Sequence, residues 1–152
     1  MKTIADAEVL RSLKERLGEL KPDSRRRWGT LTPHEMVCHL GDATDMVTRV
    51  RPRKNPIPHR HRRLLKWIAL WSAMPWPHGR PTNPMHDPRA EGTRPSVFAK
   101  DLARLLAGLD TLAAATEGSL EPAHGLFGTM TTPDWQRWAY RHTDYHLRQF
   151  GI

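Results

Sequence analysis

The sequence predicts an all-α fold: a four-helix bundle in up-down-down-up order, with a long crossover between its second and third helices. Apolar residues recur at helical spacing in four segments, and no segment alternates apolar and polar residues as a strand does. Threonine-proline pairs mark the starts of two of these segments, and the connections between segments differ greatly in length. With 152 residues, the chain is expected to form a single domain over residues 1–152.

The first two helices are predicted from leucine spacing and from a capping signal. The first covers residues 5–20, and its apolar face consists of Leu10, Leu13, Leu17 and Leu20. The second begins at Thr32-Pro33-His34-Glu35, which supplies a threonine cap, a proline at the first helical position and the glutamate of a capping box. Its apolar stripe consists of Met36, Leu40, Ala43, Val47 and Val50. The pair Arg51-Pro52 is expected to end it.

The third and fourth helices are predicted in the same way. The third follows Pro95 and stops at Gly118, and its apolar face consists of Phe98, Leu102, Leu105, Leu106, Leu109 and Leu112. The fourth is expected to start with Thr132 as its cap and Pro133 at the first helical position. Its inner stripe consists of Trp135, Trp138, Ala139, His142, His146 and Gln149, with Phe150 beside it.

The connection lengths predict the order of the bundle. About eleven residues join the first two helices, more than forty separate the second from the third, and about fifteen join the third to the fourth. A long crossover allows consecutive helices to run parallel. We therefore expect the second and fourth helices to run antiparallel to each other.

The crossover, residues 51–95, contains nine of the 13 prolines, which favours loops and short turns. It is nevertheless rich in tryptophan and leucine, so we expect an ordered excursion packed on the bundle, with one short helix over residues 62–74. Trp67, Trp71 and Trp76 are expected to fix this excursion to the bundle, or alternatively to line a substrate pocket.

All of the excess positive charge lies in or beside this crossover. Between Met46 and His86 there are nine Lys or Arg residues and no Asp or Glu, which leaves 15 basic and 16 acidic residues elsewhere. For the basic segment 49–80 we rank a solvated surface first, steering of an anionic substrate or thiol second, and nucleic-acid binding third. No known nucleic-acid motif is present, and the prolines argue against a continuous recognition helix.

Three of the nine histidines lie on predicted helix faces near the core: His39, His142 and His146. Residues four apart on a helix lie one above the other, so His142 and His146 can direct both rings at one metal ion. His39 lies about 9 Å from the start of its helix, and the midpoint of His142 and His146 lies about 9 Å from the end of theirs. If these helices are antiparallel, all three rings lie at one level of the bundle.

Three neutral imidazoles with one open position are typical of a catalytic zinc site, and the same ligands also suit nickel or iron. We therefore predict a divalent metal site at His39, His142 and His146 and assign no further catalytic residue. Hydrogen-bond partners of the rings are expected from nearby polar residues, with these candidates: Glu35, Asp42, Asp144 and Tyr145. Cys38 is expected to be a small core residue rather than a ligand, and His34 an exposed polar residue.

The segments 28–42 (WGTLTPHEMVCHLGD), 127–135 (FGTMTTPDW) and 142–152 (HTDYHLRQFGI) resemble the DinB/YfiT-like superfamily. The chain is most similar to a branch of it known only as a domain of unknown function. The resemblance covers the second and fourth helices, whereas the first and third match only as amphipathic helices.

The resemblance implies an up-down-down-up bundle, often dimeric, with a metal triad that corresponds to His39, His142 and His146. Relatives include thiol-dependent S-transferases and a mycothiol-dependent maleylpyruvate isomerase, in which the metal activates a low-molecular-weight thiol. For this branch the resemblance implies no particular activity, because a shared fold does not specify function.

Two hypotheses for function follow. The preferred one is a metal-dependent enzyme that activates water or a small thiol, for thiol transfer, isomerisation or hydrolysis of a small molecule. The rival is a non-catalytic binding or stress-response module that contacts an anionic partner through its basic crossover. Cytoplasmic location is expected, because Cys38 is the only cysteine and neither a secretory signal nor a membrane span is visible.

Overall fold

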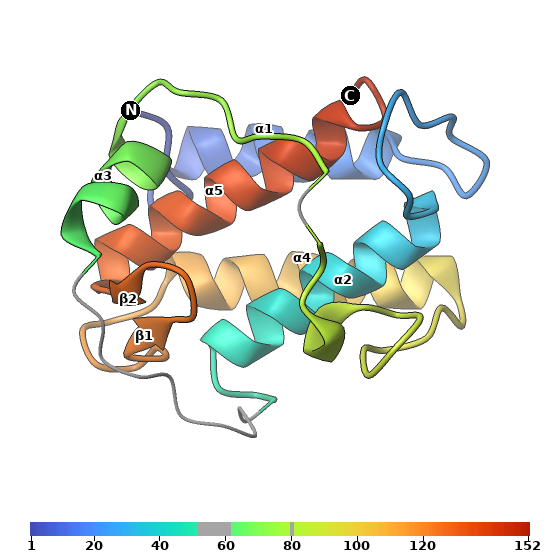
Figure 1. Cartoon of the computed structure of the whole chain (residues 1–152). Coiled ribbons are helices and arrows are strands. Elements are labelled where there is room, and N and C mark those ends of the chain that lie inside the picture. The colour runs from blue at the N-terminus through green and yellow to red at the C-terminus, as the bar shows by residue number, and fades with distance from the viewer. Residues whose placement is uncertain (52–61, 80) are drawn as a thin grey trace.

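The computed structural model describes residues 1–51, 62–79 and 81–152, and these residues are mostly helical (Figure 1). Their α-helices are α1 (Ala7–Glu19), α2 (Pro33–Val47), α3 (Arg63–Trp71), α4 (Phe98–Ala113) and α5 (Thr132–Arg148). A short 3-10 turn, η1 (Pro84–His86), lies between α3 and α4. The predicted helices are thus present, although each of the first four ends earlier than the sequence suggested, most of all α4, which ends at Ala113 instead of continuing to Gly118.

The described residues also include a short hairpin that the sequence analysis missed. Its strands are β1 (Ala123–His124) and β2 (Gly128–Thr129), which pair antiparallel. Two residues per strand are too few to display an alternating pattern, so the prediction of a purely helical chain was wrong at this point.

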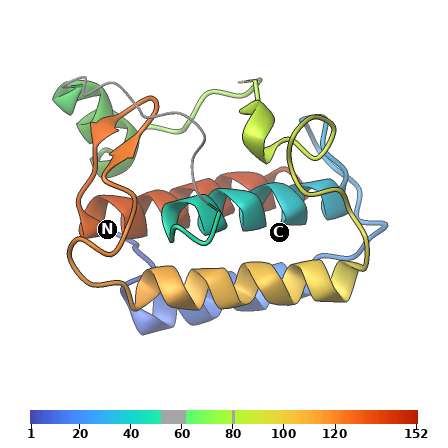
Figure 2. The same ribbon diagram turned by 90° about the horizontal axis from the view of Figure 1, so that it is seen from below.

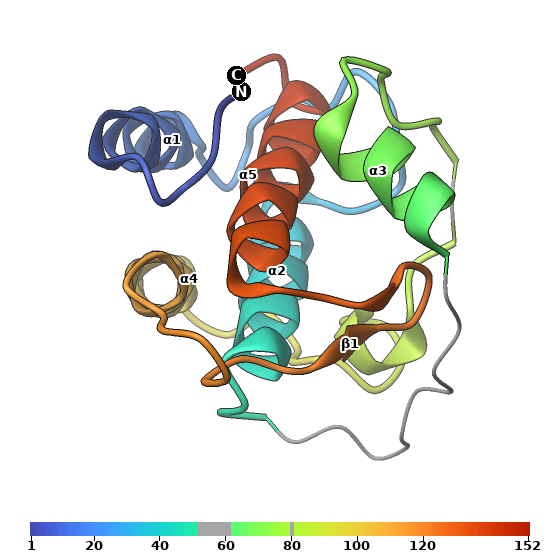
Figure 3. The same cartoon turned by 90° about the vertical axis from the view of Figure 1, so that its left-hand side faces the viewer.

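The helices form layers, which are visible in Figures 2 and 3. α1 and α4 form one layer, and α2 and α5 form the middle one. α3, the hairpin and η1 cover the other side of the middle layer. The middle layer is therefore covered on both sides, which explains why twelve of the fifteen residues of α2 are buried.

Both middle helices begin with a capping box. The Thr32 hydroxyl accepts a hydrogen bond from the Glu35 amide, and the Glu35 carboxylate accepts one from the Thr32 amide. In α5 the equivalent pair is Thr131 and Asp134. The cap is therefore Thr131, one residue before the predicted Thr132, because Asp134 lies three residues after Thr131 and closes the reciprocal pair.

α2 and α5 run antiparallel, and backbone hydrogen bonds tie both ends of the pair. Before α2 begins, the Arg27 amide donates to the carbonyl oxygen of Gln149, just after α5. At the other end, the Glu121 amide donates to the Val47 carbonyl, and the Trp135 indole donates to the Glu121 carbonyl. These ties fix the helices against sliding along each other.

α4 runs alongside α2 and is attached by a partly buried ion-pair cluster. The Arg104 guanidinium contacts the carboxylates of Asp42 (3.0 Å) and Asp45 (2.8 Å). Farther along, Gly108 lies so close to Thr44 that a β-carbon there would come within 2.9 Å of the threonine methyl group. The small residue thus permits the close approach of the two helices.

The crossover is attached to α5 through Asp134. This carboxylate accepts hydrogen bonds from Lys66 (2.6 Å) and from the Trp71 indole (2.9 Å), and the Trp76 indole donates to the Ala69 carbonyl. The predicted anchoring is thus found for Trp71, and for Trp76 through its ring, whose centroid lies 6.2 Å from His142 and 5.9 Å from Tyr145 of α5. It is wrong for Trp67, which is 57% exposed.

The core is continuous across the middle layer and is made of aliphatic and aromatic side chains, including Leu17, Met36, Leu105 and Trp135. Trp135 is fully buried and Trp138 nearly so, as the stripe on α5 predicted. Among the helices that the structure describes, none combines the length and apolar character needed to cross a membrane.

Replacing Thr32 with alanine should lower the free energy of unfolding by about 1 kcal/mol, because α2 then loses one side of its capping box. Thr131→Ala should have a similar effect through α5. Urea denaturation followed by circular dichroism measures both changes. Thr111→Ala, at an exposed position inside α4, is the matched control and should change stability by less than about 0.5 kcal/mol. Equal stability of the Thr32 variant and the control would contradict the assigned role of the cap.

Candidate metal centre

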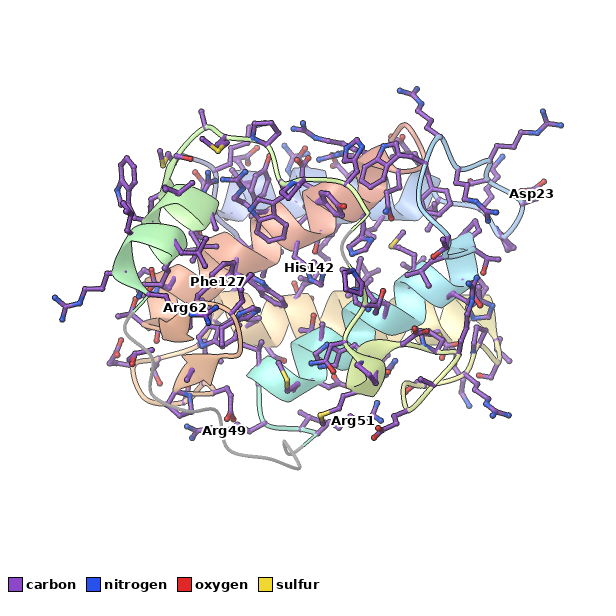
Figure 4. The ribbon with its side chains drawn as sticks, viewed as in Figure 1. Asp23, Arg49, Arg51, Arg62, Phe127 and His142 are labelled. Atoms are coloured by element: carbon purple, nitrogen blue, oxygen red, sulfur yellow. The ribbon has the colours of Figure 1, made fainter. Side chains whose placement is uncertain are left out.

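Three histidines from the two middle helices converge between α2 and α5. His39 comes from α2, and His142 (Figure 4) and His146 come from successive turns of α5. One ring nitrogen of each lies within 4.8 Å of the others. The predicted convergence is therefore present, and these residues form a group that could hold a metal ion.

The ring of His39 is oriented by the crossover. Its Nδ1 lies 2.9 Å from the carbonyl oxygen of His86, at the end of η1. A carbonyl oxygen can only accept, so Nδ1 carries the proton and donates it. The lone pair of His39 is therefore on Nε2, the nitrogen that faces the other two rings.

The ring of His146 is oriented by Gln149. Its Nδ1 lies 2.8 Å from the amide oxygen Oε1, which leaves the lone pair on Nε2. Gln149 is itself held against Gly29, where a β-carbon would come within 2.7 Å of the amide nitrogen. Gly29 also has a φ of +86°, so two properties of glycine are needed for this contact.

His142 faces His39 directly, with 3.2 Å between their Nε2 atoms. Two imidazole nitrogens in a tetrahedral zinc site, each about 2.05 Å from the metal, are about 3.3 Å apart. The observed separation thus fits two ligands of one ion. Because the Nε2 of His39 carries a lone pair, either a proton on the His142 Nε2 or a shared cation lies between the two nitrogens, since two opposed lone pairs would repel.

The centre favours neutral imidazoles, which are the form that binds metals. Burial lowers the pKa of His39, and it lowers the pKa of His142 well below the usual value, with the neighbouring His146 and His39 rings adding to the effect. Burial and the adjacent His39 lower the pKa of His146 to about 3. At neutral pH all three rings can therefore act as ligands without first losing a proton.

Aromatic rings surround the three imidazoles. Trp138 and Trp76 lie against His142, with ring centroids 4.6 Å and 6.2 Å away. Tyr145 meets His146 edge-on at 5.3 Å. These rings limit the access of water, which strengthens electrostatic interactions inside the centre.

The acidic candidates named in the sequence analysis contact arginines instead of the imidazoles. Asp42 binds Arg104 and Arg51, Glu35 binds Arg89, and Asp144 binds Arg16 and Arg148. The hydroxyl of Tyr145 donates to the Pro77 carbonyl, so only its ring lies against the centre. The expectation that one of these residues orients a ligand through its polar group was therefore wrong.

The actual orienting groups, the carbonyl of His86 and the side chain of Gln149, were not identified from the sequence. Gln149 could have been found, because it lies three residues after His146 on the same face. The His86 carbonyl could not, because a backbone oxygen has no sequence signature and is separated from His39 by most of the crossover. His86, which supplies this carbonyl, is itself buried, with 8% of its surface exposed.

A second cluster contains Cys38, His34 and Asp101, whose candidate ligand atoms also lie within 4.8 Å of one another. His34 is half-buried and its Nε2 lies 2.7 Å from an Asp101 oxygen, so the prediction of an exposed residue was wrong. Cys38 is fully buried, as predicted. Burial, together with the Asp101 charge, raises the pKa of its thiol to about 12. Hydrogen bonds satisfy this cluster, which ties α2 to the start of α4.

Two histidines of the crossover, His59 and His61, lie outside the described residues. The other loop histidines, His78 and His124, stack on Trp28 and Phe127 respectively and take no part in the triad. The triad is thus made only of the three histidines that the helical periodicity selected.

A scan against family models, a search of curated proteins and a search of solved structures found no match to this chain. The resemblance described above therefore remains a prediction, and the function is argued from the side chains themselves.

The lowered pKa values predict that the metal-free protein loses stability as the pH falls from 7 to 5. In this range the unfolded chain protonates its histidines near pH 6.5, whereas His146 in the folded protein stays neutral down to about pH 3. The unfolded state thus binds more protons, and the free energy of unfolding should fall with decreasing pH, by about 1 kcal/mol per pH unit for each such histidine.

Urea denaturation in the presence of a chelator, repeated at several pH values, measures this slope. His146→Gln should reduce it by roughly one histidine's share. Thr111→Ala, which changes an exposed residue without a titratable group, is the control and should leave it unchanged. A slope that is the same in both variants would show that residue 146 is not protected from protonation.

Proposed function

We propose that this protein is a metal-dependent enzyme in which His39, His142 and His146 hold one divalent cation. The observation that carries the proposal is the 3.2 Å separation of the His39 and His142 Nε2 atoms. The His86 carbonyl orients the ring of His39, and the Gln149 side chain orients the ring of His146. When bound, such a cation lowers the pKa of a coordinated water or small thiol and so supplies a nucleophile at neutral pH.

The ligand atoms limit which metals the site can bind. Three imidazole nitrogens suit zinc, nickel or iron, whereas magnesium and calcium require oxygen ligands. Among the described residues, the carboxylates nearest in sequence to the triad form ion pairs with arginines. None of these carboxylates is therefore available as an oxygen ligand for magnesium or calcium. Three protein ligands also leave a tetrahedral position for an exogenous molecule, as in catalytic sites.

The chain's own residues supply orientation and enclosure. The His86 carbonyl and Gln149 fix the proton positions on two of the rings, which raises their basicity as ligands. Trp76 and Trp138 cover His142 and restrict water around it. Since no carboxylate of the described residues groups with the three imidazole nitrogens, we assign the reaction to activation of water or a low-molecular-weight thiol rather than to a carboxylate base.

We further propose that the fold is an up-down-down-up four-helix bundle of the DinB/YfiT-like type. Three pairings support this order. Arg16 near the end of α1 contacts Asp144 near the end of α5, His34 near the start of α2 contacts Asp101 near the start of α4, and α2 opposes α5. A small-molecule substrate, a cytoplasmic location and a homodimer are part of the same proposal.

The metal content of the protein tests the site. Protein purified without a histidine tag and reconstituted with zinc should contain about one equivalent of metal by elemental analysis. His39→Ala, His142→Ala and His146→Ala should each lower it strongly, and the triple variant to trace levels, because each removes one of three ligands. The matched control, His78→Ala, should retain the full equivalent. Equal trace metal in the wild type and the triple variant would rule out the site.

The open ligand position can be tested with cobalt in place of zinc. Addition of a small thiol to the cobalt-loaded protein should produce a sulfur-to-cobalt charge-transfer absorption, because a thiolate would occupy the fourth position. The free amino acid serine, which has no thiol, should not produce it. A protein that binds one equivalent of cobalt but shows no change with any small thiol would favour water activation, or a non-catalytic module if hydrolysis is also absent.

A further inference from the structure

A pocket of about 480 Å3 lies beside the histidine centre, on the opposite side of the Trp76–Tyr145 wall. It is bounded by the α5 face that carries Arg137, Arg141 and Arg148, by the segment 72–78, and by Arg27 and Trp28 ahead of α2. None of the three histidines lines it. It is therefore a separate cavity, and the proposed metal function does not account for it.

The pocket has an excess of positive charge. Four arginines line it (Arg27, Arg137, Arg141 and Arg148), together with a single carboxylate, Asp144. Asp144 already accepts from Arg148 (2.8 Å) and from Arg16 (2.8 Å), which lies outside the pocket. One carboxylate cannot neutralise this group, so the cavity attracts anions.

Two of the arginines donate to backbone carbonyl oxygens. Arg137 is 7% exposed, and its guanidinium donates to the carbonyl oxygens of Leu70 and Lys2. Arg141 donates to the carbonyl oxygens of Ser72 and Met74. Within the described residues neither forms an ion pair with a carboxylate. The carbonyl oxygens take up only part of the five N–H donors of each guanidinium and do not neutralise its charge.

The lack of an ion-pair partner among the described residues is also evident in the pKa values of these two arginines. Burial lowers the pKa of both guanidinium groups, and for Arg141 the repulsion from Arg137 adds to the effect. A guanidinium stays charged in proteins, so the charge is present and is poorly compensated. A bound anion would relieve this repulsion and form charge-assisted hydrogen bonds, which are stronger than those to neutral acceptors.

Aromatic side chains form the rest of the wall. Trp28 stacks on His78 with ring centroids 3.7 Å apart, and Tyr145 meets Trp28 edge-on at 4.8 Å. The Arg141 guanidinium lies 5.5 Å from the centre of the Trp76 ring. Planar surfaces next to guanidinium groups suit a ligand with a flat body and an anionic end.

We propose that this pocket binds a small organic anion, with its carboxylate or phosphate group at Arg137 and Arg141 and its planar body against Trp28 and Trp76. The Trp76 ring also lies 6.2 Å from His142, and Tyr145 lies 5.3 Å from His146. The pocket is thus one ring layer away from the imidazoles. Binding of the anion itself requires no metal, so the inference stands independently of the proposed enzyme.

Tryptophan fluorescence of the full-length, chelator-treated protein tests this inference, with benzoate, phenyl phosphate and inorganic phosphate as probes and benzyl alcohol as the neutral analogue. Saturable changes with benzoate or phenyl phosphate that weaken with added salt are expected, and comparison of the two distinguishes a carboxylate from a phosphate ligand. Benzyl alcohol binding as tightly as both anions would overturn the role of charge. Inorganic phosphate binding as tightly as phenyl phosphate would overturn the role of the aromatic wall.

Two sets of variants locate the site. Arg141→Gln should weaken binding of the better probe at least tenfold, whereas Arg11→Gln, on the exposed side of α1, should change it less than twofold. Because Arg141 also holds residues 72–74, the double variant R27Q/R148Q removes two exposed pocket charges and should weaken binding without that risk. Trp28→Ala should weaken the binding of phenyl phosphate more than the binding of inorganic phosphate. Unchanged affinity in a folded R141Q or R27Q/R148Q protein would overturn the proposal.

Discussion

The antiparallel contact between α2 and α5 determines the rest of the site. Backbone hydrogen bonds at both ends of the pair, from Arg27 to Gln149 and from Glu121 to Val47, fix the axial position of one helix against the other. A shift of a single residue would move a ring by about 1.5 Å along the axis. Such a shift would be enough to break the match between His39 and the two histidines of α5. The hydrogen bonds and core contacts of the middle layer thus hold together imidazoles that, without a shared proton or cation, would oppose each other through their lone pairs.

The sequence predicted the helices because their signals are local. Apolar periodicity and threonine-proline starts depend on neighbouring residues, so the positions of α2, α4 and α5 could be obtained without knowledge of the fold. The errors also have local causes. Two threonines precede Pro133, and only the reciprocal bond with Asp134 distinguishes Thr131 as the cap. The hairpin of β1 and β2 is too short to produce a pattern, and its pairing depends on the hydrogen bonds around it.

The sequence predicted the three candidate ligands of the site but not the groups that orient their rings. The triad follows from helical spacing and from the relative levels of two antiparallel helices, both of which are geometric rules. The orienting groups depend on the path of the crossover, which places the His86 carbonyl against His39. The nearby carboxylates were reasonable candidates, but each is closer to an arginine from another element. Competition between a neutral imidazole and a guanidinium for one carboxylate favours the guanidinium, because a charge-assisted hydrogen bond is the stronger one.

This competition also explains why the charge of the pocket was not visible in the sequence. Outside the segment between Met46 and His86, basic and acidic residues nearly balance, so composition alone indicates no anion site. In the folded chain Arg104 of α4 binds the α2 carboxylates of Asp42 and Asp45, and Asp144 is shared between two arginines outside the Arg137–Arg141 pair. Basic and acidic residues therefore balance in number along this part of the sequence, but they do not balance at each place in the folded chain. Positive charge accumulates on the α5 face that carries Arg137 and Arg141. A cation held by the triad would lie on the other side of the same aromatic wall. Positive charge on both sides of Trp76 would create a field that favours an anionic molecule along this part of α5.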